Sequence, residues 1–166
     1  LQQNSIKSWA LEHAVPIQNP STSSSEETQW LKTLEIDLVI VMAYGHILKR
    51  DLIEVAPSGC FNLHASLLPA FRGASPIETA LAMGERETGV TLMRVVPRMD
   101  AGPIVDVERV AIDGEDTGQT LRSKIAHACV PLMDRNLSSL LATGVDERPQ
   151  DETLATYCRK LTKLDG

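Results

Sequence analysis

Three side chains suited to acyl-transfer chemistry stand at two places in the sequence. Asn62 and His64 are two residues apart in an apolar segment, so strand alternation places both side chains on one face. Asp100 lies in a short glycine-containing loop further along. An amide donor beside an imidazole can stabilise an oxyanion and move a proton, and a nearby carboxylate can orient or charge the imidazole. Asn62, His64 and Asp100 are therefore the candidate catalytic residues for transferring an acyl group to an amine.

These residues also have ordinary structural interpretations. His64 can simply cap a strand, and an aspartate close to a glycine is common in turns. The chemistry needs no serine or cysteine nucleophile, because the attacking amine would come with the substrate. The three cysteines, at positions 60, 129 and 158, are widely spaced and lack a metal-ligand pattern, so we predict neither a disulfide framework nor a zinc site.

The strands expected around these residues belong to an open α/β sheet. Residues 37–43 form an apolar, β-branched run without alternation, which predicts a parallel strand buried on both faces at the centre of the sheet. Further strands are expected at 60–64, 88–96 and 104–112. Alternating strands and helices imply a mostly parallel sheet whose ligands bind beyond the carboxyl ends of the strands. His64 ends one such strand.

Helices are expected between and around the strands. Ser75, Pro76 and Glu78 have the spacing of an N-terminal capping box with proline in the first turn. Pro131 lies inside the longest expected helix and predicts a kink there. The expected helices cover residues 5–13, a segment ending near 34, and residues 49–55, 76–84 and 117–142.

Composition and charge restrict the class of protein. The chain has 166 residues, of which 43% are hydrophobic and 23% charged, as in one globular domain. Its net charge of −6 argues against nucleic-acid binding by this segment alone. The longest apolar run, 38–43, is too short to cross a bilayer. We therefore predict a cytoplasmic protein without a membrane partner.

One run of sixteen residues carries a resemblance to a known family. Residues 62–77, Asn-Leu-His-Ala-Ser-Leu-Leu-Pro-Ala-Phe-Arg-Gly-Ala-Ser-Pro-Ile, resemble the signature of the folate-dependent formyltransferases, and Asp100 follows His64 at the spacing of that family. The family includes enzymes that formylate glycinamide ribonucleotide, sugar amines or Met-tRNA. Segments 72–77, 87–93 and 150–163 are similar to the tRNA branch. The alternatives are a formyltransferase for glycinamide ribonucleotide or a sugar amine, or a non-catalytic folate-binding module.

The resemblance implies a fold, a reaction and partners. The fold would be a Rossmann-like formyltransferase domain that is N-terminally truncated, with 1–144 a partial catalytic domain and 145–166 a linker toward a C-terminal tRNA-binding domain. The reaction would move the formyl group of 10-formyltetrahydrofolate to the α-amine of initiator Met-tRNA in translation initiation, with no metal. We expect the tRNA to bind mainly through segments outside this chain, and the protein to be a monomer.

The resemblance also implies binding residues. The pterin ring would lie against the segment 41–48 and the loop 96–102, and Ser66 and Arg72 would contact the substrate. For Arg72 an equal alternative is that it holds the loop backbone. Ala70 and Glu78 depart from residues frequent in the tRNA branch, and helix capping accounts for Glu78. The cofactor-binding residues implied are Met42, Ala43, Tyr44, Gly45, Ile47, Leu48, Val96, Met99 and Asp100.

Overall fold

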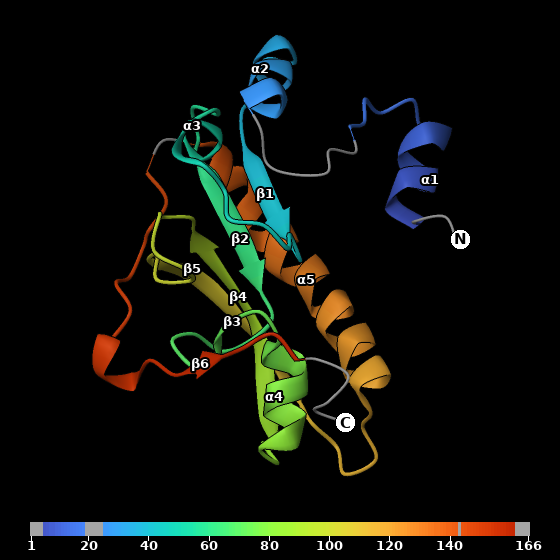
Figure 1. Ribbon diagram of the computed structural model, residues 1–166, viewed down its shortest axis with the longest axis vertical. Coiled ribbons are helices and arrows are strands. Elements are labelled where there is room, and N and C mark those ends of the chain that lie inside the picture. Colours follow the sequence, from blue (N-terminus) through green and yellow to red (C-terminus); the bar gives the residue numbers. More distant parts are fainter. Residues whose placement is uncertain (1–4, 19–24, 143, 162–166) are drawn as a thin grey trace.

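Four strands form one mixed sheet in the computed structural model, which describes residues 5–18, 25–142 and 144–161 (Figure 1). The strands are β1 (Val39–Met42), β2 (Cys60–His64), β4 (Glu87–Arg94) and β5 (Ile104–Ala111), in the order β1-β2-β4-β5. Strands β1 and β2 are parallel, whereas β4 is antiparallel to both β2 and β5. The expectation of a mostly parallel sheet was therefore wrong for these strands.

The antiparallel pairings follow from the connections between the strands. The connection from β4 to β5 contains no helix, and only crossover connections return a chain to the start of a parallel neighbour. After β2 the chain remains at the carboxyl edge of the sheet, so β4 starts beside the end of β2 and Thr91 pairs with His64. Strand type was predictable from the residues, but strand direction depended on these connections.

Strand β1 is an edge strand among the described residues. It pairs only with β2, and its side chains alternate between half-buried and exposed, with Ile40 and Met42 on the exposed face. The prediction that this run lies at the centre of the sheet was wrong for the described chain. Its apolar character shows what the strand can bury, but not which neighbours it has.

All the expected helices are present: α1 (Ser5–Glu12), α2 (Ser25–Thr33), α3 (Arg50–Ile53), α4 (Pro76–Ala82) and α5 (Gly118–Leu141). None of the helices in the described ranges is long and apolar enough to cross a membrane. The predicted capping box of α4 was wrong. The Ser75 hydroxyl accepts from the Leu161 amide instead of capping the helix, and Glu78 pairs with Arg122 on α5.

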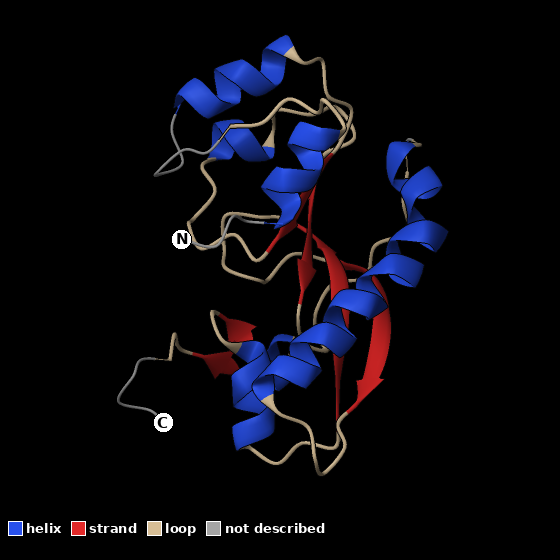
Figure 2. Ribbon diagram, turned by 90° about the vertical axis from the view of Figure 1, so that its right-hand side faces the viewer, coloured by secondary structure: helices blue, strands red, loops and turns tan. Residues whose placement is uncertain are grey.

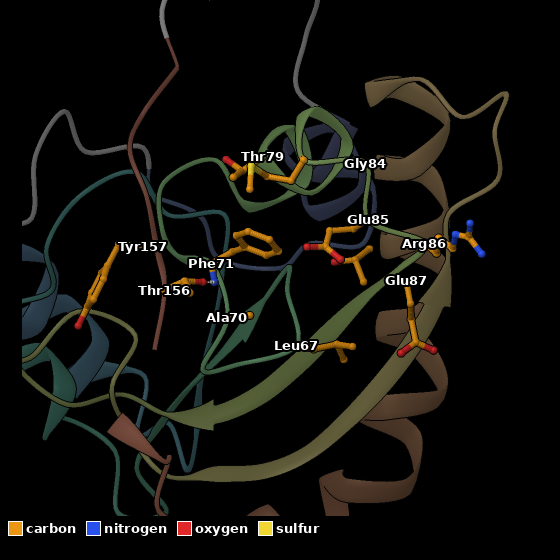
Figure 3. A pocket seen from close by; sticks show the side chains of 12 residues that line it. Leu67, Ala70, Phe71, Thr79, Gly84, Glu85, Arg86, Glu87, Thr156 and Tyr157 are labelled. Carbon is orange, nitrogen blue, oxygen red and sulfur yellow. Dashed lines mark hydrogen bonds between the residues drawn. The ribbon is translucent and has the colours of Figure 1, made fainter. Parts of the chain in front are cut away.

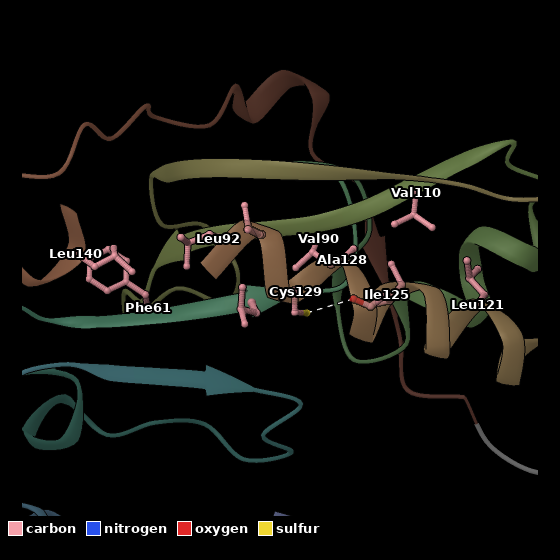
Figure 4. Packing of buried hydrophobic residues seen from close by; sticks show 11 residues of the cluster. Phe61, Val90, Leu92, Val110, Leu121, Ile125, Ala128, Cys129 and Leu140 are labelled. Carbon is pink, nitrogen blue, oxygen red and sulfur yellow. Dashed lines mark hydrogen bonds between the residues drawn. The ribbon is translucent and has the colours of Figure 1, made fainter. Parts of the chain in front are cut away.

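Helix α5 crosses one face of the sheet and buries the main hydrophobic core (Figure 2). Its N-terminus is closed by a reciprocal capping box between Thr117 and Thr120, and the helix continues through Pro131. Figure 4 shows its apolar side chains facing those of β2, β4 and β5. This packing makes β2 a rigid support for the residues at its carboxyl end. The core comprises Phe61, Leu63, Val90, Leu92, Val110, Leu121, Ile125, Ala128, Cys129, Leu132 and Leu140.

The segment after α5 returns to the loops at the carboxyl edge of β2. Strand β6 (Tyr157–Cys158) pairs in parallel with β3 (Arg72–Gly73), and a bridge joins Arg148 to Ile104. The short helix η1 (Glu152–Leu154) lies between Arg148 and β6 in sequence. Part of the predicted linker, up to Cys158, thus packs against β3 and the start of β5. Residues 162–166 of the predicted linker lie outside the described ranges.

Candidate active site

Asn62 and His64 lie toward the carboxyl end of β2, a strand whose Phe61 and Leu63 side chains belong to the hydrophobic core. Their alternate positions on β2 give them one face, as predicted, and His64 is buried whereas Asn62 is half-buried. Their strand neighbours are Met93 and Thr91 on β4. Among the described residues the Asn62 carboxamide has no side-chain hydrogen bond, which leaves its N–H groups available to a ligand.

The structure brings Asp100 to His64, as the sequence predicted. The Asp100 Oδ2 atom lies 3.7 Å from the His64 Nδ1 atom and accepts a 2.8 Å hydrogen bond from the Gly73 amide. On the other side of the ring, Nε2 lies 2.9 Å from the Phe71 carbonyl oxygen. A carbonyl only accepts, so Nε2 carries a hydrogen in this contact. His64 is thus held between a carboxylate and a carbonyl.

Buried hydrogen bonds hold the loop that provides the Phe71 carbonyl. The Ser66 hydroxyl donates to the Ala70 carbonyl at 2.6 Å, and Ser66 is fully buried. Its own carbonyl accepts from the Thr91 hydroxyl at 2.6 Å, and that hydroxyl accepts in turn from the Leu68 amide. The Ser66 hydroxyl therefore shapes the loop and is closed to solvent in this structure, and the substrate contact through Ser66 stays a prediction.

Arg72 is fully buried and binds the segment that follows α5. Its Nη1 and Nη2 atoms donate to the two carboxylate oxygens of Glu152 at 3.1 and 3.0 Å, and its Nε and Nη2 atoms donate to the Gln150 Oε1 atom at 3.0 and 2.7 Å. The hydrogen bond from Arg72 lowers the pKa of the Glu152 carboxyl, which keeps that side chain charged. This arrangement favours the alternative in which Arg72 holds the loop.

The contribution of the segment 150–158 was missed at the level of the sequence. The Thr156 hydroxyl accepts from the Phe71 amide at 2.8 Å, and the Thr156 carbonyl accepts from the Arg72 amide at 2.9 Å. A Cβ atom on Gly73 would lie 2.1 Å from the Cys158 carbonyl oxygen, and Gly73 has a positive φ of 121°. Only glycine fits here. The polar residues of 150–156 were the available signal, but their partners lie some eighty residues away.

The residues predicted to bind the cofactor form two exposed apolar segments beside this site. Met42 ends β1 and Met99 belongs to the loop that carries Asp100, and both side chains are about half exposed. Ile47 is 87% exposed. Because β1 and β2 are parallel, the end of β1 at Met42 lies at the same sheet edge as His64 (Figure 1). Exposed apolar side chains at a sheet edge are typical of a surface that a ligand covers. The remaining predicted members are Ala43, Tyr44, Gly45, Leu48 and Val96.

The cysteine on the same strand as Asn62 and His64 does not supply a nucleophile. Burial raises the pKa of the Cys60 thiol to about 11, and the charge of Arg94 only partly opposes this effect. Because the thiolate is the reactive form, the thiol is inert at neutral pH. Cys129 and Cys158 are also buried, and burial raises the pKa of each thiol. Among the described residues, no group of three or more His, Cys, Asp or Glu is placed to hold a metal.

A cavity of about 750 Å³ opens next to the loop 67–71, between that loop, the end of α4 and the start of β4 (Figure 3). Phe71 and Tyr157 belong to its lining, but Asn62, His64 and Asp100 do not. The cavity therefore lies on the other side of this loop from the candidate catalytic residues and does not contain them. The pKa of Tyr157 is lowered by hydrogen bonds from Arg72 and Arg98.

Comparison with protein families gives a match over most of the chain. Residues 1–136 match the sequence profile described as formyl transferase. Curated relatives include the methionyl-tRNA formyltransferase of Kosmotoga olearia, 41% identical over 161 residues, and that of Methylococcus capsulatus, 42% identical over 162 residues. The alignments cover 96% and 97% of this chain but 52% and 53% of those proteins. The chain thus spans about half the length of these relatives.

Solved structures share the fold. Phosphoribosylglycinamide formyltransferase from Bacillus halodurans superposes with a TM-score of 0.74 at 33% identity, covering 86% of this chain and 78% of that one. An N-formyltransferase from Helicobacter canadensis, in complex with folinic acid and dTDP-3-aminofucose, superposes with a TM-score of 0.78 at 22% identity, covering 95% of this chain and 55% of that one. The second likeness bears on the fold alone.

Proposed function

The chain belongs to the formyl transferase family, and on that premise we propose that the protein moves the formyl group of 10-formyltetrahydrofolate to the α-amine of initiator methionyl-tRNA. The observation that carries this proposal is the meeting of Asn62, His64 and Asp100 at one end of β2. The acceptor is inferred from the relatives named methionyl-tRNA formyltransferase, which are about 40% identical over nearly the whole chain.

The bound donor supplies an activated formyl group: a bond forms between the acceptor amine and the formyl carbon, the bond to the folate nitrogen breaks, and one proton passes from the amine to that nitrogen. The residues of the chain must therefore stabilise negative charge on the formyl oxygen and handle one proton. Both tasks fit an amide, an imidazole and a carboxylate.

Asn62 is the residue best placed to donate a hydrogen bond to the formyl oxygen. Its carboxamide lies on the same strand face as His64 and has no competing side-chain partner among the described residues. A donor already fixed on a rigid strand stabilises developing charge without reorganising when the reaction occurs. Asn62 is thus proposed as the oxyanion donor.

His64 and Asp100 are proposed to stabilise the same charge and to transfer the proton. In its positively charged form, His64 is stabilised by the Asp100 carboxylate at 3.7 Å, which is too long for a direct hydrogen bond but short enough for an ion pair. The Nε2 hydrogen is engaged by the Phe71 carbonyl, so donation from that nitrogen to a substrate requires release of this bond. Contacts of this kind commonly rearrange when substrate binds. Asp100 is the nearby carboxylate through which a proton can pass.

The apolar segments beside the site fit a flat aromatic group such as a pterin. Met42, Ile47 and Met99 have exposed apolar side chains, and a planar ring packed on them would remove apolar surface from contact with water. We propose that these side chains, with the backbone of 43–45 and 96–100, bind the folate.

The tRNA is proposed to bind mainly through parts of the protein outside these 166 residues. The chain carries a net charge of −6, whereas binding of a phosphate backbone depends on lysine and arginine. The segment alone should therefore bind tRNA weakly, which a salt titration would measure.

The acceptor assay tests the proposal directly. The full-length protein is given 10-formyltetrahydrofolate and, in turn, initiator methionyl-tRNA, glycinamide ribonucleotide and a dTDP-linked amino sugar, and kcat/KM is measured for each. We expect the tRNA to be preferred. Preference for glycinamide ribonucleotide, the acceptor suggested by the 33% identical structure, would reject the acceptor but keep the reaction. Folate binding without transfer to any acceptor would instead support a non-catalytic module.

A further inference from the structure

Resting on the proposed function, we infer that Gln150 is a positioning residue for formyl transfer: its carboxamide fixes the loop that carries Asp100 against the loop that holds His64. Gln150 touches none of Asn62, His64 or the Asp100 carboxylate through the contacts described. Its Nε2 atom donates to the Asp100 carbonyl at 2.9 Å and to the Gly102 carbonyl at 2.7 Å. Its Oε1 atom accepts from Arg72 at 3.0 and 2.7 Å.

The orientation of this carboxamide follows from its partners. Arginine only donates and backbone carbonyls only accept, so the oxygen must face Arg72 and the nitrogen must face the Asp100 loop. Both N–H groups and both oxygen lone pairs are used, which is the full hydrogen-bonding capacity of a glutamine side chain. Turning the amide over would place two donors against the guanidinium and an oxygen against two carbonyls.

The two loops joined by Gln150 each hold one member of the catalytic pair. On one side, the carbonyl that Gln150 binds belongs to Asp100 itself, whose backbone has the left-handed φ of 47°. Such a conformation is sparsely populated without support from its surroundings. On the other side, Arg72 follows Phe71 and precedes Gly73, which bind His64 and Asp100 through their backbones. Gln150 therefore sets the separation of the two loops.

No other residue type can make the same four bonds. Glutamate would accept from Arg72 but present an oxygen to both carbonyls, and asparagine is one methylene shorter. Methionine has nearly the same length and volume but neither donor. Gln150→Met and Gln150→Glu therefore remove the connection to the Asp100 loop with little change of volume. Gln119, exposed on α5, provides the matched control Gln119→Glu.

The experiment is a double-mutant cycle in the full-length protein with 10-formyltetrahydrofolate and methionyl-tRNA. We expect each Gln150 variant to lower kcat by about 10²-fold, the cost of a small misplacement of catalytic groups. The KM values should stay within about twofold and Gln119→Glu should behave as wild type, because only the arrangement of the reacting groups changes. In an Asp100→Asn background, Gln150→Met should cost less than about threefold, because residues that act as a unit are not additive.

A second readout does not depend on activity. The Gly73 amide donates to the Asp100 carboxylate, so its hydrogen exchange should be about tenfold faster in Gln150→Met if the loop loses its position. Unchanged exchange, additive losses in the cycle, or a fall confined to KM would each overturn the inference. Failure of both variants to fold would do so too, since Gln150 would then serve the fold. If the wild type formylates no acceptor, the proposed function fails. Hydrogen exchange at the Gly73 amide then still tests whether Gln150 holds the Asp100 loop in place.

Discussion

The polar residues at the carboxyl end of β2 form one side of the candidate site and the apolar Met42, Ile47 and Met99 the proposed other side, and the two sides are held very differently. His64 and Asp100 are bound by the Phe71 carbonyl and the Gly73 amide, and segment 150–158 holds that loop in turn. Ile47 and Met99 have exposed side chains. Catalytic groups must be in place before charge develops, whereas an apolar wall gains free energy only when a ligand covers it. The two sides should therefore respond differently to substitution.

The largest expected effect lies on the polar side. Asn62→Ala should lower kcat by about 10²–10³-fold, the usual cost of one oxyanion donor, because the carboxamide acts on charge absent from the ground state. His64→Ala should be at least as severe. The folate Kd should change little, as measured by equilibrium titration beside single-turnover rates. Near-normal kcat in Asn62→Ala, or a loss due only to weaker folate binding, would end the oxyanion role.

A smaller loss of kcat is expected for Asp100→Asn, which removes the charge of the side chain but keeps its shape. In Asp100→Asn the side-chain oxygen can still accept from the Gly73 amide. The loop should therefore survive, while a protonated His64 loses its counter-charge. We expect kcat to fall by about 10²-fold, in the range of acid–base contributions, with an unchanged melting temperature. A variant as active as wild type would show that the 3.7 Å ion pair has no part in the reaction.

Substitutions on the apolar side should weaken folate binding and leave kcat unchanged. Ile47→Ser removes an exposed side chain, so the fold should not suffer. If the pterin packs there, the folate Kd should rise by about tenfold, equivalent to about 1.4 kcal/mol, with kcat nearly constant. Val130→Ser, another exposed β-branched residue but on α5, is the control. Equal Kd values for the two variants would remove Ile47 from the binding surface.

The smallest effect concerns Cys60, which begins β2 but takes no part in the proposed chemistry. Burial raises the pKa of its thiol from about 9 in the unfolded chain to about 11 in the folded protein. This shift adds nothing to the pH dependence below pH 9, where the thiol is neutral in both states, and it lowers the free energy of unfolding as pH rises from 9 toward 11. The difference in free energy of unfolding between wild type and Cys60→Ala should thus fall by roughly 1 kcal/mol between pH 8 and pH 10. That corresponds to about 2–4 °C in melting temperature by calorimetry. Formyl transfer at neutral pH should be equal in both proteins.

The parts of the site that depend on local pattern were predictable. Strand β2 begins and ends at the predicted residues, because its apolar positions and the Pro-Ser-Gly turn before it act over a few residues. The same alternation put Asn62 and His64 on one face. The approach of Asp100 was foreseen from the family signature, and the structure places it beside His64.

Other features needed the folded chain. The sequence of 37–43 shows a strand that can be buried, but its place at the sheet edge depends on which strands pair with it. Glu78 had the spacing of a cap, yet Arg122, 44 residues away, binds it.

By itself, the sequence determined the elements, the shared face of Asn62 and His64, and the family, because these depend on residue types at short spacing. Only the tertiary structure decided that Arg72 and Ser66 are buried, and that Gln150 joins the Asp100 loop to Arg72. The Arg72 and Gln150 side chains are 78 residues apart in the chain. A hydrogen bond forms only when donor and acceptor come within about 3 Å, and over such a separation the packing of the whole domain sets that distance.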